Sequence, residues 1–332
     1  MGPRYASLAS PGDFDLLRRW PIPIAIAVLL AVVMGAFFLA PRSHEVVLHL
    51  GDQRGATRAI LEAAGELKNM PYKIEWDVFP VGAPLIEAMK AGAVDFGYVG
   101  SSTMTFGLAS GAPLKVINVW RIDGPGSGML VAGNGPIRKV ADLKGRRVAV
   151  VRGSPGHLLV IEALQQAGLT PRDVDLIFLS AGDAKAALAS GAVDAWAIWD
   201  PYLAIGERQD GDRVLITSDQ VAGEVECGVA TDAAIALKRP ELLDFIARFR
   251  RANLWAQAHP EQAAEVYARE TGVPLDIARI VRGRMHVDVL PEVTDAAIAA
   301  HQHAADIYAQ IGLVPRLDIA KVYDRSFAIV DR

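Results

Sequence analysis

Three short turns combine glycine with small polar residues, and each is followed by a segment with helical periodicity. They lie at residues 51–55, 100–103 and 153–156. The first amides of a helix have no intrahelical partner and carry partial positive charge, so such turns can bind a small anion. The same pattern also occurs in turns that only connect a strand to a helix. An anion site and a purely connecting role are therefore both open.

Two tryptophans and an aspartate follow one another closely in an apolar run. Trp196 and Trp199 are three positions apart in a predicted strand, which places them on opposite faces. One is expected in the core, and the other can form an apolar wall for an organic ligand. Asp200 ends the run before Pro201 and can bond to a neighbouring element or to a cationic group.

Residues suited to catalysis or metal binding are sparse. His301 and His303 are two apart in a predicted helix and do not share a face, and no His-Glu-x-x-His spacing occurs. Cys227 is the single cysteine, for which we expect a buried, inert thiol. His157 either lines a ligand site or faces solvent in a first helical turn. We therefore predict binding without catalysis, metal or cofactor.

The elements that position these residues occur twice. Residues 190–202 (SGAVDAWAIWDPY) repeat the pattern of residues 91–99 (AGAVDFGYV), 99 positions earlier. Each copy follows a short apolar helix, turns at a glycine and enters a buried strand. Upstream, predicted strands at 46–50 and 74–79 match those at 147–151 and 174–179. The sequence therefore predicts a duplication that builds two similar α/β lobes.

The expected fold has two lobes joined by a hinge, each a mostly parallel sheet flanked by helices. Lobe I comprises residues 44–128 and 228–332, and lobe II comprises residues 129–227. Four helical segments after residue 239 have no sheet of their own and should pack on lobe I and the back of the hinge. Ligands bind at the carboxyl ends of strands in open α/β sheets, which predicts a site in the interlobe cleft.

The first 43 residues indicate export. Arg18 and Arg19 precede a run of nineteen uncharged residues, 22–40, which is long enough for a transmembrane helix. A cleaved signal peptide and a retained membrane anchor both fit this pattern. Either one places the rest of the chain outside the cytoplasm, because positive charge before the run favours an internal N-terminus.

Bulk composition narrows the class further. The chain has 332 residues, is 52% hydrophobic and carries a formal net charge of -4, so it can form two packed lobes. No basic run with interleaved aromatic residues is present, which argues against nucleic acid as a partner. A single cysteine excludes an internal disulfide.

From residue 46 to about residue 328, the chain resembles the periplasmic substrate-binding proteins of ABC transporters for aliphatic sulfonates, taurine and nitrate. The motifs that carry the resemblance are LGDQR (50–54), GAVD (92–95), VADLKG (140–145), ALQQAGL (163–169) and DAWAIWDPY (194–202). The last of them looks most like the alkanesulfonate branch. The resemblance implies a monomeric, type II periplasmic binding protein. Such a protein closes on a small anionic organic ligand and delivers it to a membrane permease driven by an ATPase.

The resemblance also implies a ligand shell, although the chain departs from the family in three places. Residues 99–102 (VGSS), 226–229 (ECGV) and 282–286 (RGRMH) replace the stretches usual in sulfonate binders. Glu226 favours a ligand with an amine, such as taurine, unless it is a rim carboxylate. The ligand shell would fall on Gln53, Ser101, Ser102, Ser154, His157, Trp196 and Asp200.

Two other functions remain as alternatives. A thiamin-pyrimidine-related binding protein or enzyme can use the same fold, but such an enzyme requires a cytoplasmic chain and a cleft rich in histidine or cysteine. A membrane-tethered sensor or adaptor would use residues 22–40 as a permanent anchor.

Overall fold

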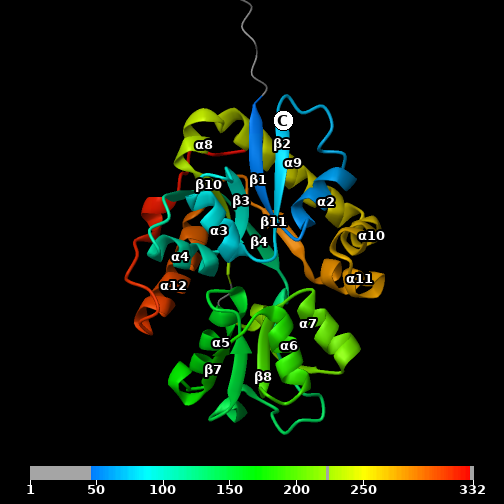
Figure 1. Ribbon diagram of the computed structural model, residues 1–332, viewed down its shortest axis with the longest axis vertical. Helices are drawn as coiled ribbons and strands as arrows, with labels where there is room; N and C mark the ends of the chain where they lie inside the picture. The colour runs from blue at the N-terminus through cyan, green and yellow to red at the C-terminus, as the bar shows by residue number, and fades with distance from the viewer. Residues whose placement is uncertain (1–45, 222–223, 330–332) are drawn as a thin grey trace, which may run out of the picture. The chain divides into compact units, whose positions relative to one another are not determined.

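Two β-sheets organise the part of the chain that the computed structural model describes, residues 46–221 and 224–329 (Figure 1). The predicted export segment, residues 1–43, lies outside these residues. The first sheet has the strand order β11-β4-β10-β3-β1-β2, and the second has the order β7-β6-β8-β5-β9. The first comprises β1 (Val47–Gln53), β2 (Lys73–Phe79), β3 (Phe96–Gly100), β4 (Leu114–Asp123), β10 (Glu226–Thr231) and β11 (His286–Val289). The second comprises β5 (Ser127–Val131), β6 (Arg147–Val150), β7 (Asp175–Phe178), β8 (Ala195–Trp199) and β9 (Arg213–Thr217).

The strand pairing confirms the predicted duplication. β1 pairs in parallel with β2 and β3, and β6 pairs in parallel with β7 and β8. A matching hydrogen bond occurs in each copy: the His49 amide donates to Asp95 over 2.8 Å, and the Arg147 amide donates to Asp194 over 2.9 Å. The equivalent aspartates therefore fasten equivalent strands.

Most strands of each sheet run in one direction, as predicted, and β10 and β11 in the first sheet and β5 in the second run against it. β10 runs antiparallel to β3 and β4, and β5 runs antiparallel to β8 and β9. β4 leads into β5 and β9 leads into β10, so the chain crosses between the sheets twice. β5 and β10 are the strands that arrive from the other sheet, and both run opposite to the strands beside them.

Helices cover both faces of the first sheet (Figure 1). One face carries α2 (Ala56–Ala63) and α9 (Arg239–Ala258), whose apolar residues share a core with Phe96 and Tyr98 of β3. The other face carries α3 (Gly82–Lys90), α4 (Ser101–Ala109) and α12 (Asp295–Gln310). The remaining helices near this sheet are α8 (Asp232–Leu237), α10 (Pro260–Thr271) and α11 (Leu275–Arg284). The helices predicted after residue 239 are confirmed, and α9 and α10 begin with proline in the first turn as expected.

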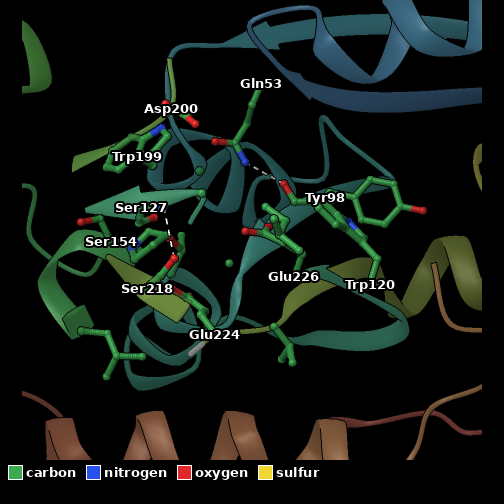
Figure 2. A pocket seen from close by; sticks show the side chains of 18 of the residues that line it. Gln53, Tyr98, Trp120, Ser127, Ser154, Trp199, Asp200, Ser218, Glu224 and Glu226 are labelled. Carbon is green, nitrogen blue, oxygen red and sulfur yellow. Dashed lines mark hydrogen bonds between the residues drawn. The ribbon is translucent and has the colours of Figure 1, made fainter. Parts of the chain in front are cut away.

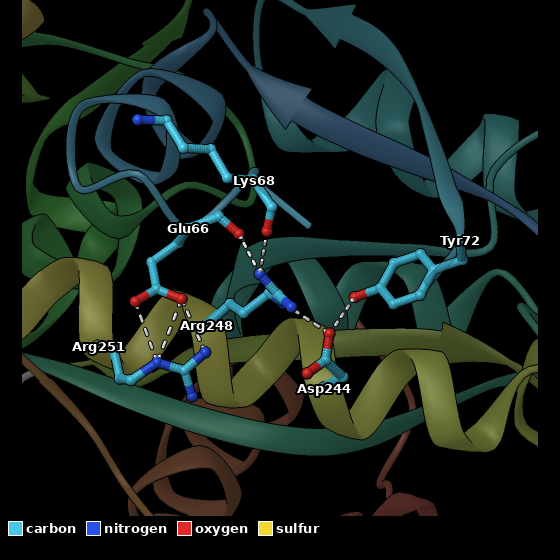
Figure 3. A network of polar contacts seen from close by, with 6 residues as sticks. All are labelled: Glu66, Lys68, Tyr72, Asp244, Arg248 and Arg251. Atoms are coloured by element: carbon cyan, nitrogen blue, oxygen red, sulfur yellow. Dashed lines mark hydrogen bonds and ion pairs between the residues drawn. The ribbon is translucent and has the colours of Figure 1, made fainter. Parts of the chain in front are cut away.

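A polar network fastens α9 to the segment between α2 and β2 (Figure 3). Arg248 donates to the Asp244 carboxylate and to the carbonyl of Glu66, each over 2.6 Å. Tyr72 donates to the same carboxylate over 3.0 Å, and Arg251 pairs with the Glu66 side chain. These bonds hold α9 against the segment between α2 and β2.

The second sheet carries α5 (Pro155–Gln166), α6 (Ala181–Ala189) and α7 (Tyr202–Ile205). A Cβ at Gly156 would lie 2.7 Å from the carbonyl oxygen of Ala197, so α5 approaches β8 more closely than a side chain would allow. Apolar residues of α5 also share a core with α12, including Leu158, Ile161, Ile307 and Tyr308. α12 therefore contacts helices of both sheets.

Within residues 46–221 and 224–329, we find no helix with both the length and the apolar character needed to cross a bilayer.

Candidate ligand-binding site

A cavity of about 940 Å³ is lined by residues of both sheets (Figure 2). Its wall includes Gln53 at the end of β1, Gly100 at the end of β3, Ser154 after β6 and Asp200 after β8. Four equivalent strand ends therefore converge on one space, as the sequence predicted. The volume suits a small organic ligand, and carboxyl strand ends are the usual place for one.

The predicted anion donors of the first turn already have partners. The amides of Thr57 and Arg58, in the first turn of α2, donate to the two carboxylate oxygens of Asp52 over 3.1 and 3.0 Å. Burial raises the pKa of Asp52, although these bonds oppose the shift. An internal carboxylate thus occupies the helix end that we had expected to face a ligand anion.

The second predicted turn is also occupied. The Ser102 amide, at the start of α4, donates to the Glu224 carboxylate, and the Ser101 amide donates to the carbonyl of Val225 over 2.8 Å. Both serines are fully buried, and the Ser102 hydroxyl accepts from Tyr308 over 3.1 Å. Ser101 and Ser102 therefore lie behind the cavity wall.

The third turn caps α5 internally. The Ser154 hydroxyl accepts from the His157 amide over 3.2 Å, and the Gly153 amide donates to Nδ1 of His157 over 3.2 Å. Ser154 lines the cavity, whereas His157 is fully buried between Phe106, Phe178 and Tyr308. Burial and the nearby Arg152 lower the pKa of His157 to about 4. Neither expected position of His157, in the ligand site or facing solvent, is correct.

Of the two tryptophans, Trp199 lines the cavity (Figure 2). Trp196 is fully buried in the second-sheet core, and its ring centre lies 6.0 Å from that of Tyr202. The expectation that Trp196 belongs to the ligand shell is corrected here, because the alternating strand faces turn Trp196 inward. Sequence spacing separated the two tryptophans correctly but did not say which face met the cavity.

Gln53 and Asp200 have positions on the wall that fit the expected shell. The side-chain amide of Gln53 donates through Nε2 to the backbone carbonyl of Tyr98 over 2.8 Å. The Asp200 Oδ1 accepts from the Ala204 amide over 3.0 Å and lies 3.5 Å from Arg284, whereas its buried Oδ2 has no hydrogen-bond partner. Burial raises the pKa of Asp200 to about 6. Arg284 ends α11, so this pair joins the two sheets.

Three arginines on the cavity wall were missed by sequence reasoning. Arg54 donates to the Tyr202 hydroxyl over 2.9 Å, and Arg152 lies 3.8 Å from the ring centre of Phe178. Arg121 pairs with Asp288 over 3.1 Å. Arg54 directly follows β1 and Arg152 lies two residues after β6, so their similar places in the duplicated turns were a usable signal.

Two glutamates bring carboxyl groups to the same wall (Figure 2). Glu224 and Glu226 both line the cavity, next to Gly100. Burial is the main cause that raises the pKa of Glu224 to about 7 and that of Glu226 to about 8. The cavity therefore presents both guanidinium groups and protonatable carboxyls to a ligand.

The thiol lies outside this wall. Cys227 is fully buried, with its sulfur 3.9 Å from Nδ1 of His301 and 3.8 Å from the Tyr323 hydroxyl. Burial raises the pKa of Cys227. His301 points into this core, while His303 contacts Glu162 over 3.2 Å. In the described part of the chain, no three histidine, cysteine or acidic side chains are grouped to hold a metal ion.

Two helix-flanked sheets with a ligand-sized cavity between their strand ends define the periplasmic-binding-protein fold. A family model described as NMT1/THI5 like matches residues 80–263. The chain is also 33% identical over 298 residues to an aliphatic sulfonates-binding protein of Escherichia coli (strain K12), covering 89% of this chain and 93% of that protein. The chain therefore belongs to the NMT1/THI5-like family.

Solved structures agree with this assignment. The alkanesulfonate-binding protein SsuA from Xanthomonas axonopodis pv. citri, bound to MOPS, is 27% identical with a TM-score of 0.78, over 86% of this chain and 100% of that chain. The desulfurization enzyme DSZB, at 18% identity and a TM-score of 0.59, covers 85% of this chain and 97% of its own and shares the fold. The fold by itself thus accommodates both binding proteins and an enzyme.

Proposed function

We propose that this protein is the solute-binding component of an ABC importer. It binds a small organic oxyanion, an aliphatic sulfonate or taurine, in the cavity between its sheets and delivers it to a membrane permease whose ATPase supplies the energy. The observation that carries this proposal is the cavity, whose wall contains both arginines and an aromatic side chain. The similarity of the chain to sulfonate-binding proteins supports it.

The wall divides into parts suited to the two ends of such a ligand. Arg54 and Arg152 can neutralise a sulfonate, and Gln53 and Ser154 can add hydrogen bonds. Trp199 can pack against the organic tail. In this arrangement Trp199 replaces Trp196 in the expected ligand shell, while Asp200 acts through its contact with Arg284.

Closure of the two lobes around the ligand is part of the proposal. In this proposal lobe I comprises residues 44–128 and 228–332, and lobe II comprises residues 129–227. Side chains that cross between the sheets support it: Thr103 donates to the carbonyl of Gly153 over 3.1 Å, and Arg284 pairs with Asp200 and Glu207. Such contacts can form as the lobes close and release as they open.

We place the part of the chain after the export segment in the periplasm, which the names of two relatives from Escherichia coli mention. The export segment, residues 1–43, then serves as a cleaved signal or as an anchor. The mass of the protein recovered from the producing cell tests this. A mature chain that lacks the segment identifies a signal, and a full-length chain in the membrane fraction identifies an anchor.

A thermal-shift screen of residues 44–332 tests the function. Ethanesulfonate, taurine, MOPS, an aromatic sulfonate, nitrate and a thiamin-pyrimidine precursor serve as ligands. A sulfonate present at 100 times its Kd should stabilise the fold by about 2.7 kcal/mol, because it binds only the folded chain. Stabilisation by the pyrimidine alone would replace the sulfonate proposal, and no shift with any ligand would favour a sensor or adaptor.

A further inference from the structure

Glu224 is the side chain that occupies the amino end of α4. It precedes β10 and reaches the Ser102 amide with one carboxylate oxygen, Oε1. Its other oxygen, Oε2, is buried and has no hydrogen-bond partner in the described part of the chain. An oxyanion seated at this helix end would have to displace Glu224, because the two groups use the same donor.

Glu226 shares this place. It is two residues further on and begins β10, and its carboxyl lies beside the same glycine as that of Glu224. A Cβ at Gly100 would lie 2.6 Å from Oε1 of Glu224 and 3.6 Å from Oε1 of Glu226. The absence of a side chain at Gly100 thus leaves room for two converging carboxyls.

Glu224 and Glu226, hereafter the Glu224–Glu226 pair, have no cationic partner in the described part of the chain. Among residues 46–221 and 224–329, neither carboxyl forms an ion pair with a lysine, arginine or histidine. The titratable groups nearest to it are Tyr308 of α12 and Glu162 of α5, which contacts His303, while Cys227 of β10 points to the other face of the strand. Burial raises the pKa of Tyr308 and that of Cys227, so both stay neutral, and Glu162 adds negative charge.

Two half-buried carboxyls that lie close together without a cation cannot both be ionised at low cost. The Glu224–Glu226 pair therefore holds at least one proton near neutral pH, in agreement with its raised pKa values. A sulfonate, which is a strong acid, keeps its negative charge throughout this range. Its entry beside the pair raises the cost of ionising the carboxyls further, and so binds a proton.

We propose that the Glu224–Glu226 pair is a specificity element that couples oxyanion binding to proton uptake. This inference rests on the proposed function. Deprotonated Glu224 repels the ligand and holds the Ser102 amide in a charge-assisted bond, and protonation removes the repulsion and weakens that bond. Affinity for a simple sulfonate then falls as pH rises through the range in which the pair titrates, by up to about tenfold per pH unit for each proton bound.

Isothermal titration with ethanesulfonate between about pH 6 and about pH 9, in two buffers of different ionisation enthalpy, measures affinity and proton uptake together. Wild type should take up a proton and lose affinity with rising pH. Glu224→Gln keeps an acceptor for the Ser102 amide, so it should fold, take up less proton and bind about tenfold tighter than wild type near pH 9. Glu87→Gln, which removes the same charge from the exposed outer face of α3, should behave as wild type.

Two results would overturn the coupling. One is an affinity for ethanesulfonate that does not change with pH. The other is proton release together with much tighter binding of taurine near pH 9, which would make the pair a site for an ammonium group.

Infrared spectroscopy of the ligand-free protein separates this inference from the proposed function. Near neutral pH, wild type should show the carbonyl stretch of a protonated carboxylic acid, and Glu224→Gln should lose or shift it. Absence of that band in wild type overturns the inference whatever binds. A normal band in a protein that binds no sulfonate at any pH overturns the proposed function, and the coupling with it.

Discussion

The guanidinium of Arg54 donates a hydrogen bond of 2.9 Å to the hydroxyl of Tyr202. The same guanidinium lies 5.4 Å from the centre of the tyrosine ring. Arg54 follows β1 in the first sheet and Tyr202 begins α7 in the second, so the contact joins the sheets at the cavity. A charged group that could bind the ligand is thereby also a group that could hold the closed form together.

Tyr202→Phe should weaken ligand binding by about twofold to tenfold, because it removes one hydrogen bond worth about 0.5–1.5 kcal/mol and keeps the ring. Arg54→Ala should weaken it more, since the charge is lost as well. Titration calorimetry with the best sulfonate of the screen measures both, and thermal unfolding without ligand should show a folded protein. An unchanged Kd for Tyr202→Phe would show that the contact does not support closure.

The two tryptophans should respond differently to truncation. Trp199→Ala should lower sulfonate affinity by about tenfold with little loss of stability, because Trp199 lines the cavity. Trp196→Ala should cost about 3–5 kcal/mol of unfolding free energy, because that side chain is fully buried. Urea denaturation and ligand titration of both variants decide this. The assignment fails if Trp196→Ala is stable and Trp199→Ala binds normally.

Folding stability should depend on Glu226 between its ordinary pKa of 4.5 and its raised value of about 8. In this window the folded chain holds a proton that the unfolded chain has lost, so stability falls as pH rises. Glu226→Gln should flatten this fall and be more stable than wild type near pH 9, by on the order of 3 kcal/mol. Urea denaturation at a series of pH values provides the measurement, and parallel curves for the two proteins would contradict the prediction.

Cys227 should not react in the native protein. Its sulfur is buried and the pKa of its thiol is raised, and only the thiolate is a strong nucleophile. Iodoacetamide should label it in urea and leave it unlabelled in buffer over the same time. Rapid native labelling that a sulfinate or sulfonate blocks would instead favour an enzyme that uses this residue.

Because α5 packs closely on β8, two glycine substitutions should have different effects on the stability of the fold. Gly156→Ala should destabilise the fold by about 1–3 kcal/mol, because its Cβ would meet the Ala197 carbonyl oxygen at 2.7 Å. Gly182→Ala, in α6, has no atom within 4 Å of the new Cβ and should be neutral or stabilise by up to about 1 kcal/mol. Thermal unfolding of the pair tests the contact, and equal effects would exclude it.

The sequence alone determined the repeat, the strand and helix segments and the edge at which the cavity lies. These features follow from local patterns: the glycine turn before a buried strand in residues 91–99 and 190–202, and proline in the first turn of α9 and α10. The family resemblance carried by the sequence motifs pointed to Gln53, Ser154 and Asp200, which line the cavity.

Only the tertiary structure decided which groups meet inside the cavity. Glu224 reaches Ser102 across 122 positions of the chain, and Arg54 reaches Tyr202 across 148. A helix end that looks free for an anion in sequence is therefore occupied, and the inward face of β8 takes Trp196 instead of Trp199. No local pattern encodes such choices, because burial and hydrogen bonding depend on partners that folding brings from distant segments.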